Sequence, residues 1–170
     1  MSDILSFPPI ADKNATILIL GSIPGKASLE AGEYYAHPRN QFWRIIAELL
    51  NCEPLIDYPR KTQSLLNAHI ALWDVMQSCF RAGSLDAAID KSSIVTNDFS
   101  GFLAHHPYIS HIFFNGATAE QAFRRRVLPD LAIPMLHLQR LPSTSPAHAA
   151  MSYQQKLSCW DLITKELNLS

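Results

Sequence analysis

Four short apolar runs, separated by helix-compatible segments, constrain the fold of this chain most strongly. The runs cover residues 16–20, 69–73, 111–114 and 134–141, and each ends in polar or turn-forming residues. Each run is too short for an independent helix, so we interpret all four as strands. Strands joined by helical segments form a parallel sheet that is covered on both faces. The sequence therefore predicts an α/β fold, three-layer α/β/α, with a central four-stranded, mostly parallel sheet.

Three of the connecting segments carry apolar residues at helical spacing. They cover residues 40–50, 117–127 and 148–167. Arginines 124–126 lie near the end of the second segment, where positive charge complements the helix dipole, and we interpret them as a solvated helix face. No internal repeat or linker interrupts the pattern, so we expect a single domain, residues 1–170.

The composition narrows the class of protein. The chain is 48% hydrophobic and 17% charged with a net charge of −1, which is typical of a folded protein and disfavours a strongly basic nucleic-acid surface. No apolar run approaches the roughly 20 residues that span a bilayer, and the start lacks the features of a secretory signal. We therefore expect a cytoplasmic protein that makes no membrane contact.

The metal-ligating residue types are few and scattered. Cys52, Cys79 and Cys159 include no closely spaced pair, and the seven histidines form no HExxH pattern. We interpret the cysteines as reduced, packed side chains. The sequence therefore predicts no metal and no cofactor.

Polar or small residues follow each of the four predicted strands. They are residues 21–25 after the first run, Asp74 after the second, Asn115 after the third and residues 141–148 at the end of the fourth. In open parallel sheets, ligands bind outside the carboxyl ends of the strands. We therefore expect these four features to meet in one cleft.

The block at residues 35–43 (YAHPRNQFW) adds chemistry beside the first of these turns. Tyr35 offers a flat surface for stacking, and His37 and Asn40 offer hydrogen-bonding groups. The preceding turn, residues 21–25 (GSIPG), consists of small residues that let the backbone approach a ligand closely. Together the two segments predict a ligand-binding site.

Four segments together resemble the uracil-DNA glycosylase superfamily, most closely its hypoxanthine-DNA (deoxyinosine) glycosylase branch. The segments are residues 21–25 (GSIPG), 35–43 (YAHPRNQFW), 71–75 (ALWDV) and 141–147 (LPSTSPA). The second segment is also similar to the mismatch-specific uracil/thymine glycosylases. The resemblance runs from about Phe7 to Leu167, nearly the whole chain.

The resemblance implies a monofunctional DNA glycosylase of base excision repair. Such an enzyme hydrolyses the N-glycosidic bond of a deaminated base, here hypoxanthine, after flipping that base out of the duplex. Its partner is then DNA that contains deaminated bases, and we expect it to act as a monomer.

One departure from the superfamily decides the expected catalytic residue. Several branches place Asp or Asn two residues after the first glycine, where this chain has Ile23, which cannot orient water. In the hypoxanthine branch the catalytic asparagine lies in a His-Pro-x-Asn block, which matches Asn40. A neutral carboxamide is no strong base, but it can hold a water in line through its oxygen, with no nearby carboxylate partner. Stabilisation of the departing base then supplies most of the barrier reduction.

The resemblance assigns two further groups of residues. Those expected to contact the flipped base are Gly21, Ser22, Ile23, Pro24, Tyr35, His37, Asp74 and Asn115. Those expected to contact DNA are Ser143, Thr144, Ser145, Pro146 and His148. Many relatives are expected to carry asparagine at the position of His148.

Structural interpretations of the same residues stay open at this point. Asp74 can cap a helix, and Tyr35 can be a core aromatic. Asn115, followed by glycine, can form a plain turn, and His37 can be a structural histidine. Ser145, followed by proline, can begin a helix.

Other functions also stay open. The nearest is a uracil-preferring or mismatch-specific glycosylase of the same superfamily. A non-catalytic nucleic-acid binder with this fold is the alternative from another class, and a nucleotide-hydrolysing enzyme is a third. A lysine-based lyase step is disfavoured because residues 35–43 contain no lysine, with Lys26 the nearest.

Overall fold

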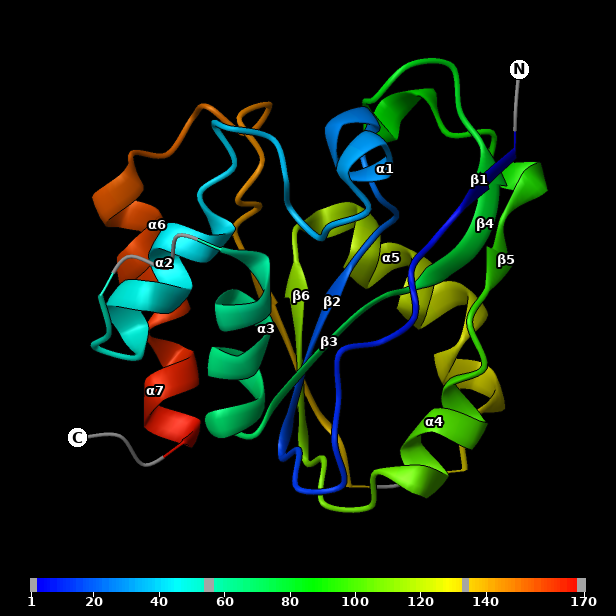
Figure 1. Ribbon diagram of the computed structural model, residues 1–170. Helices are drawn as coiled ribbons and strands as arrows, with labels where there is room; N and C mark the ends of the chain where they lie inside the picture. Colours follow the sequence, from blue (N-terminus) through cyan, green and yellow to red (C-terminus); the bar gives the residue numbers. More distant parts are fainter. Residues whose placement is uncertain (1–2, 54–56, 133–134, 168–170) are drawn as a thin grey trace.

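A computed structural model describes residues 3–53, 57–132 and 135–167. Its centre is a four-stranded parallel sheet with the strand order β3-β2-β6-β7 (Figure 1). The strands are β2 (Ile17–Gly21), β3 (Ile70–Asp74), β6 (His111–Asn115) and β7 (His137–Leu141). The predicted sheet is confirmed. The first residue of the fourth predicted run, Pro134, lies outside the described residues.

Helices cover both faces of the sheet, which confirms the predicted layers (Figure 1). One face carries α2 (Phe42–Leu49), α3 (Tyr58–Asn67), α6 (Tyr153–Trp160) and α7 (Leu162–Glu166). The other carries α4 (Phe99–His105) and α5 (Ala117–Arg126). Strand alternation separates the two cores, because Ile17 and Ile19 pack with the first group and Leu18 and Leu20 with the second. Each of these four side chains is at most 1% exposed.

Two of the three predicted helices are confirmed, and the third is partly wrong. Helices α2 and α5 lie within the predicted ranges 40–50 and 117–127. The segment predicted as one helix from residue 148 instead begins at Tyr153 and is split into α6 and α7. Ser152 caps α6 in a capping box with Gln155, which fixes the late start. The residues before Ser152 belong to a loop at the sheet edge.

Several elements were not predicted from the sequence. Strands β1 (Asp3–Leu5), β4 (Met76–Phe80) and β5 (Val95–Thr96) form a small antiparallel sheet in the order β1-β4-β5. The unpredicted helices are α1 (Lys26–Ala31), α3, α4 and the 3₁₀ turns η1 (Asp86–Ala88), η2 (Lys91–Ser93) and η3 (Leu128–Asp130). These strands are short and carry exposed apolar residues such as Leu5 and Val95, so their hydrophobic pattern is weak.

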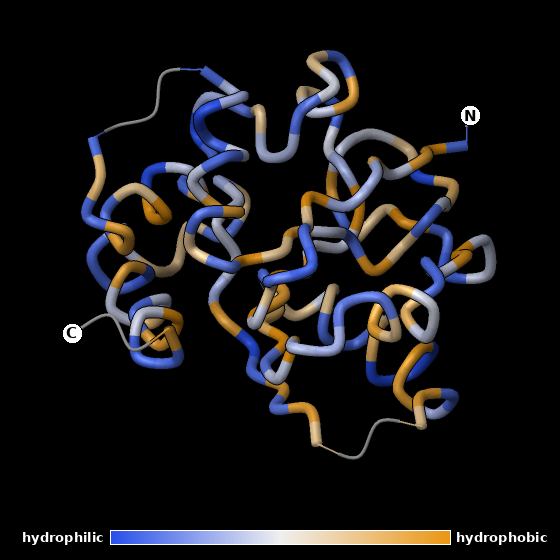
Figure 2. The backbone as a smooth tube through the Cα atoms, turned by 60° about the horizontal axis from the view of Figure 1, so that its bottom comes forward, coloured by the Kyte–Doolittle hydropathy of each residue, from blue (hydrophilic) through white to orange (hydrophobic). Residues whose placement is uncertain are grey.

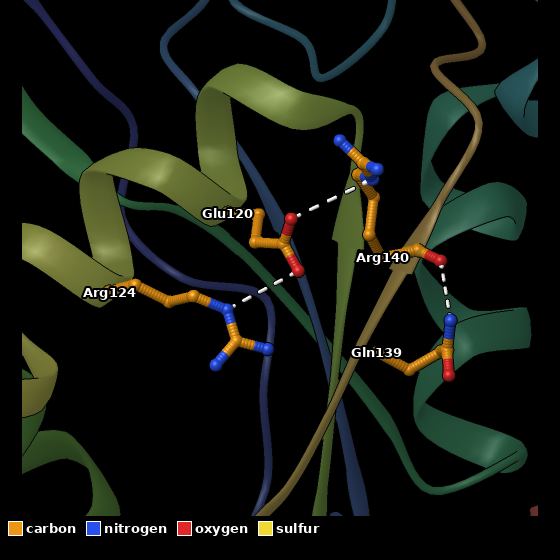
Figure 3. A network of polar contacts seen from close by, with 4 residues as sticks. All are labelled: Glu120, Arg124, Gln139 and Arg140. Carbon is orange, nitrogen blue, oxygen red and sulfur yellow. Dashed lines mark hydrogen bonds and ion pairs between the residues drawn. The ribbon is translucent and has the colours of Figure 1, made fainter.

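The arginine-rich end of α5 is solvated, as the sequence indicated. Glu120 of α5 lies between Arg124, 3.3 Å away, and Arg140 of β7, 3.6 Å away, while Gln139 donates to the Arg140 carbonyl (Figure 3). These contacts join α5 to the edge strand β7.

Colouring by hydropathy shows orange and blue stretches alternating along the helices, as expected for helices with one buried side (Figure 2).

The carboxyl ends of β2 and β6 point to the same edge of the sheet, at the top of Figure 1. The loop from residue 32 to residue 41 and the loop that follows β7 lie at this edge as well. Among the described residues, no helix is long and apolar enough to cross a membrane.

Candidate active site

Gly21 ends β2 at a point where two side-chain oxygens leave no room for a Cβ atom. A Cβ atom there would lie 2.5 Å from Asp74 Oδ1 and 2.7 Å from the Tyr35 hydroxyl. Such a separation is shorter than van der Waals contact allows, so a larger residue would displace one of these oxygens. By contrast, a Cβ atom at Gly25 would meet nothing within 4 Å. The sequence motif therefore contains one glycine that the site requires for close approach and one that it does not.

Asp74 lies opposite Gly21 in the sheet register, at the end of β3. Its side chain is buried, and its Oδ2 atom has no hydrogen-bond partner among the described residues. Burial, reinforced by the nearby charge of Asp86, raises the pKa of Asp74 to about 7. Strand β4 follows Asp74 after one residue, so the interpretation of this residue as a helix cap is wrong.

The raised pKa of Asp74 makes the stability of the protein depend on pH. Between its ordinary value of 3.8 and about 7, the folded protein holds a proton that the unfolded chain releases. The free energy of unfolding should therefore fall as pH rises through this window, by an amount on the order of a few kcal/mol.

Asp74→Asn, which cannot ionise, should remove most of that dependence and should be more stable relative to wild type at pH 8 than at pH 5. Denaturant unfolding at both pH values measures the effect, with Asp130→Asn, an exposed aspartate, as the control. An unchanged pH dependence in Asp74→Asn would contradict the assignment.

Tyr35 adopts a backbone conformation that is rare outside glycine. Its φ is 54°, a left-handed conformation that costs roughly 1–2 kcal/mol for other residues. One face of its ring packs on Phe42, with ring centroids 4.2 Å apart. The hydroxyl is buried without a hydrogen-bond partner among the described residues, and burial, with a contribution from Asp74, raises the pKa of Tyr35. The neighbouring Tyr34, 3% exposed, is the tyrosine that belongs fully to the core.

Residues of the loop after β4 hydrogen-bond to the glycine-proline turn at residues 21–25. Ser22 Oγ donates to the carboxylate of Asp86 at 3.0 and 3.1 Å, and Arg81 Nη2 donates to the carbonyl of Pro24 at 2.8 Å. Arg81 is only 6% exposed, so it is no part of an exposed cationic patch. The Ile23 side chain belongs to the hydrophobic core. Sequence reasoning missed Asp86, because no motif marks it.

Asn40 faces the hydroxyl-rich loop that follows β7. Its Oδ1 atom accepts hydrogen bonds from the Phe42 backbone N–H and from Thr144 Oγ1, both at 2.9 Å. A carbonyl oxygen has two lone pairs, so both are engaged by the protein. The expectation that this oxygen holds the attacking water is therefore not supported, and the NH₂ group is the part of the amide left to act.

Asn115 fixes the same loop from β6. Its Oδ1 atom accepts from the Thr144 backbone N–H at 2.9 Å, and its Nδ2 atom donates to Thr144 Oγ1 at 3.0 Å. The Thr144 carbonyl in turn accepts from the Gln41 backbone N–H at 3.1 Å. Asn115 is therefore more than a turn residue, although Gly116 beside it has a φ of 96°.

His37 shapes the turn that presents Asn40. Its Nδ1 atom accepts from the Arg39 backbone N–H at 3.1 Å, and its carbonyl accepts from the Asn40 backbone N–H at 2.9 Å. The side chain is exposed. These contacts support the interpretation of His37 as a structural histidine.

The hydroxyls of the loop after β7 accept hydrogen bonds from nearby backbone. Ser143 Oγ accepts from the Ser145 N–H, and Ser145 Oγ accepts from the Ala147 N–H, both at 3.2 Å. Each hydroxyl proton is then available to a phosphate oxygen. No helix begins at Pro146, so the interpretation of Ser145 as a helix cap is wrong, because the helix begins at Tyr153.

Asn40 lines a groove of about 500 Å³ whose walls carry positive charge. Three cationic residues, Arg39, Arg44 and Lys156, line it, and no acidic residue does among those described. Lys156 is 2% exposed, donates to the Ser145 carbonyl at 3.4 Å, and has its pKa lowered by burial. Sequence analysis missed Lys156, whose only signal was a polar position in a helix.

Two polar side chains that line this groove each have a buried atom without a hydrogen-bond partner among the described residues. Gln41 Oε1 and His148 Nε2 are buried without hydrogen bonds among the described residues, and both residues line the groove. The structure thus gathers Asn40, His148 and Pro146 on one groove, while Gly21, Tyr35 and Asp74 form a second group whose members do not line that groove. Asn115 and Thr144 join the second loop to Asn40.

Comparisons with known proteins identify the family of this chain. The model of the uracil DNA glycosylase superfamily matches residues 8–167. A relative from Methanosarcina acetivorans named hypoxanthine DNA glycosylase is 36% identical over 92% of this chain and 95% of its own length. One of the same name from Methanosarcina barkeri is 39% identical over 65% of this chain and 69% of its own length.

A solved structure agrees with this match. The solution NMR structure of a uracil DNA glycosylase candidate from Methanosarcina acetivorans covers 98% of this chain and 99% of its own, with 32% identity and a TM-score of 0.82. The fold and the sequence match therefore agree, and the chain belongs to the uracil DNA glycosylase superfamily.

Proposed function

We propose that this protein is a monofunctional DNA glycosylase that removes hypoxanthine from deoxyinosine in DNA. The observation that carries the proposal is the direct hydrogen bond between Asn40 and Thr144, which joins two motifs 104 residues apart at a groove with cationic walls. The relatives named hypoxanthine DNA glycosylase support the choice of base.

DNA binding is the first step of the proposed reaction. Arg39 and Lys156 in the groove attract phosphates, and the hydroxyls of Ser143 and Ser145 donate to them. We expect His148, which lines the same groove and whose Nε2 atom has no hydrogen-bond partner among the described residues, to contact the strand as well. Flipping costs a few kcal/mol and is least costly at a weak base pair, which favours deaminated bases.

We expect the flipped base to be bound by Gly21, Tyr35 and Asp74. Tyr35 supplies stacking, a contribution of about 1–3 kcal/mol per base. The ionised carboxylate of Asp74 accepts the N1–H of hypoxanthine, a proton that adenine lacks at the same position. Its unpartnered, buried Oδ2 atom is the kind of acceptor that such an N–H would satisfy. Ser22, held by Asp86, and the backbone of Ile23 and Pro24 complete this side of the site.

Cleavage breaks the bond between C1′ of the sugar and the base. The bonding electrons leave with the base and an oxocarbenium-like sugar forms. Water then adds to C1′ to give an abasic site, and the proton that this water loses balances the negative charge of the released base. Asn40 is the residue that we place at the reacting centre, because it is the carboxamide that both motifs hold in the groove.

No lysine nucleophile is needed for this hydrolysis. Lys26 is exposed and belongs to α1, whereas Lys156 lines the groove with Asn40. Lys156 rather than Lys26 is therefore the residue to replace if strand cleavage at the abasic site is ever observed.

A uracil-preferring glycosylase is the second candidate. Uracil also presents an N–H beside a carbonyl, so Asp74 would accept from it in the same way.

The proposal further includes a single domain, residues 1–170, that acts as a monomer in the cytoplasm. The match over residues 8–167 supports the single domain.

A panel of deaminated bases tests the proposed function. Single-turnover excision is measured from duplexes that carry inosine, xanthosine or deoxyuridine at one position. Hypoxanthine should be released fastest, because both relatives are named for that base. Faster release of uracil would reverse the ranking, and no release from any duplex would overturn the proposed activity.

A further inference from the structure

Three side chains from distant parts of the sequence form a directed chain of hydrogen bonds. Asn115 Nδ2 donates to Thr144 Oγ1 at 3.0 Å, and Thr144 Oγ1 donates to Asn40 Oδ1 at 2.9 Å. Thr144 is 0% exposed, so water does not compete for its hydroxyl. The chain therefore runs from the end of β6, through the loop after β7, to the block that holds Asn40.

Backbone donors fix the direction of every bond in this chain. The Phe42 N–H can only donate, so the atom of Asn40 that faces it is the oxygen. The Thr144 N–H likewise fixes the oxygen of Asn115, which turns Asn115 Nδ2 towards the Thr144 hydroxyl. That hydroxyl has one proton, and it goes to Asn40.

The Asn40 side-chain amide is therefore held in one orientation. Both lone pairs of its oxygen are engaged, and among the described residues its NH₂ group has no hydrogen-bond partner. We propose that Thr144, held by Asn115, is a positioning residue that presents the Asn40 NH₂ group as a hydrogen-bond donor to the departing base. This inference rests on the proposed function and adds to it which group of the Asn40 amide faces the departing base.

A donor suits the chemistry at this point. Negative charge grows on the base as the glycosidic bond breaks, and a fixed N–H stabilises that charge without reorganisation during the reaction. An amide free to rotate would present its oxygen for part of the time and repel the same charge. Thr144 and the Phe42 N–H together oppose that rotation, so loss of the Thr144 hydroxyl should affect the rate and affect DNA binding much less.

A substitution that removes the Thr144 hydroxyl but keeps the shape of the side chain tests this role. Thr144→Val should slow single-turnover release of hypoxanthine about 10- to 100-fold, the effect of misplacing a reacting group. Its Kd for inosine-containing duplex should stay within about threefold of wild type, because only the rate depends on the donor. Thr144→Ser, which keeps the hydroxyl, should restore most of the rate.

Two further variants make the test specific. Thr164 is 8% exposed, and its hydroxyl bonds to Asp161 away from the groove, so Thr164→Val removes the same atoms from a buried site and should leave the rate unchanged. Asn115→Ala keeps the Thr144 hydroxyl but removes both hydrogen bonds by which Asn115 holds Thr144, so it should slow release in the same direction as Thr144→Val. It keeps the test decisive if the valine variant fails to fold.

The outcomes separate the inference from the proposed function. Wild-type rates in Thr144→Val or Asn115→Ala would overturn the inference and leave the activity standing. Parallel loss of folding and DNA binding, without rescue by serine, would show a purely structural role and overturn it too. An inactive wild type would overturn the proposed function and the inference with it.

Discussion

Replacing Asn40 by aspartate should abolish most base release, although the two side chains have nearly the same shape. One carboxylate oxygen would keep the bonds to the Phe42 N–H and to Thr144, and the other would stand where the NH₂ group now stands. The reacting centre would lose a donor and gain a negative charge that repels the departing base. Loss of one such donor slows a reaction by about 100- to 1000-fold, and we expect a decrease of this size.

The rate is measured in single turnover on inosine-containing duplex at pH 7.5. Asn67→Asp, which makes the same charge change at an exposed position at the end of α3, serves as the control and should behave as wild type. Retention of wild-type rate by the Asn40→Asp enzyme would mean that Asn40 acts through an oxygen. The donor account would then be wrong.

Gly21→Ala should be the second most damaging substitution, and it adds only one methyl group. The new Cβ atom would lie 2.5 Å from Asp74 Oδ1 and 2.7 Å from the Tyr35 hydroxyl. One of the two side chains that line the proposed base site must move to make room. A displacement of about 1 Å near a reacting centre can reduce the rate about 100-fold, and we expect a loss of this order.

Gly25→Ala is the matched control in the same turn. Its Cβ atom would meet nothing within 4 Å, and its φ of −76° suits any residue. The Gly25 variant should keep the wild-type rate and thermal stability. Equal activity in the two alanine variants would show that Asp74 and Tyr35 do not form the base site.

The sheet, its edge and the helices on both faces could be predicted from the sequence because each of these elements has a recognisable local pattern of apolar residues. Strands β2 and β3 are buried along their whole length and therefore read as continuous apolar runs. The residues at their carboxyl ends, Gly21 and Asp74, could be placed at one edge by topology alone. Motif positions were thus the most predictable part of the site.

Contacts between segments were not predictable in the same way. Nothing local marks Asp86 as the partner of Ser22, because the two residues meet only when the loop after β4 folds back. Lys156 looked like an ordinary polar position of an amphipathic helix, yet it is buried under the Ser145 carbonyl. The sequence also could not show which atom of Asn40 is free, since that depends on Thr144, 104 residues away.

Release of free hypoxanthine is the measurement that tests the central claim most directly. Wild type and Asn40→Ala are incubated with a duplex that contains one inosine, and both the free base and the abasic site are quantified. The account predicts equal amounts of the two products from wild type, and binding without release from the alanine variant. Release by Asn40→Ala within tenfold of the wild-type rate would contradict it, because the reaction would then proceed without the group placed at its centre.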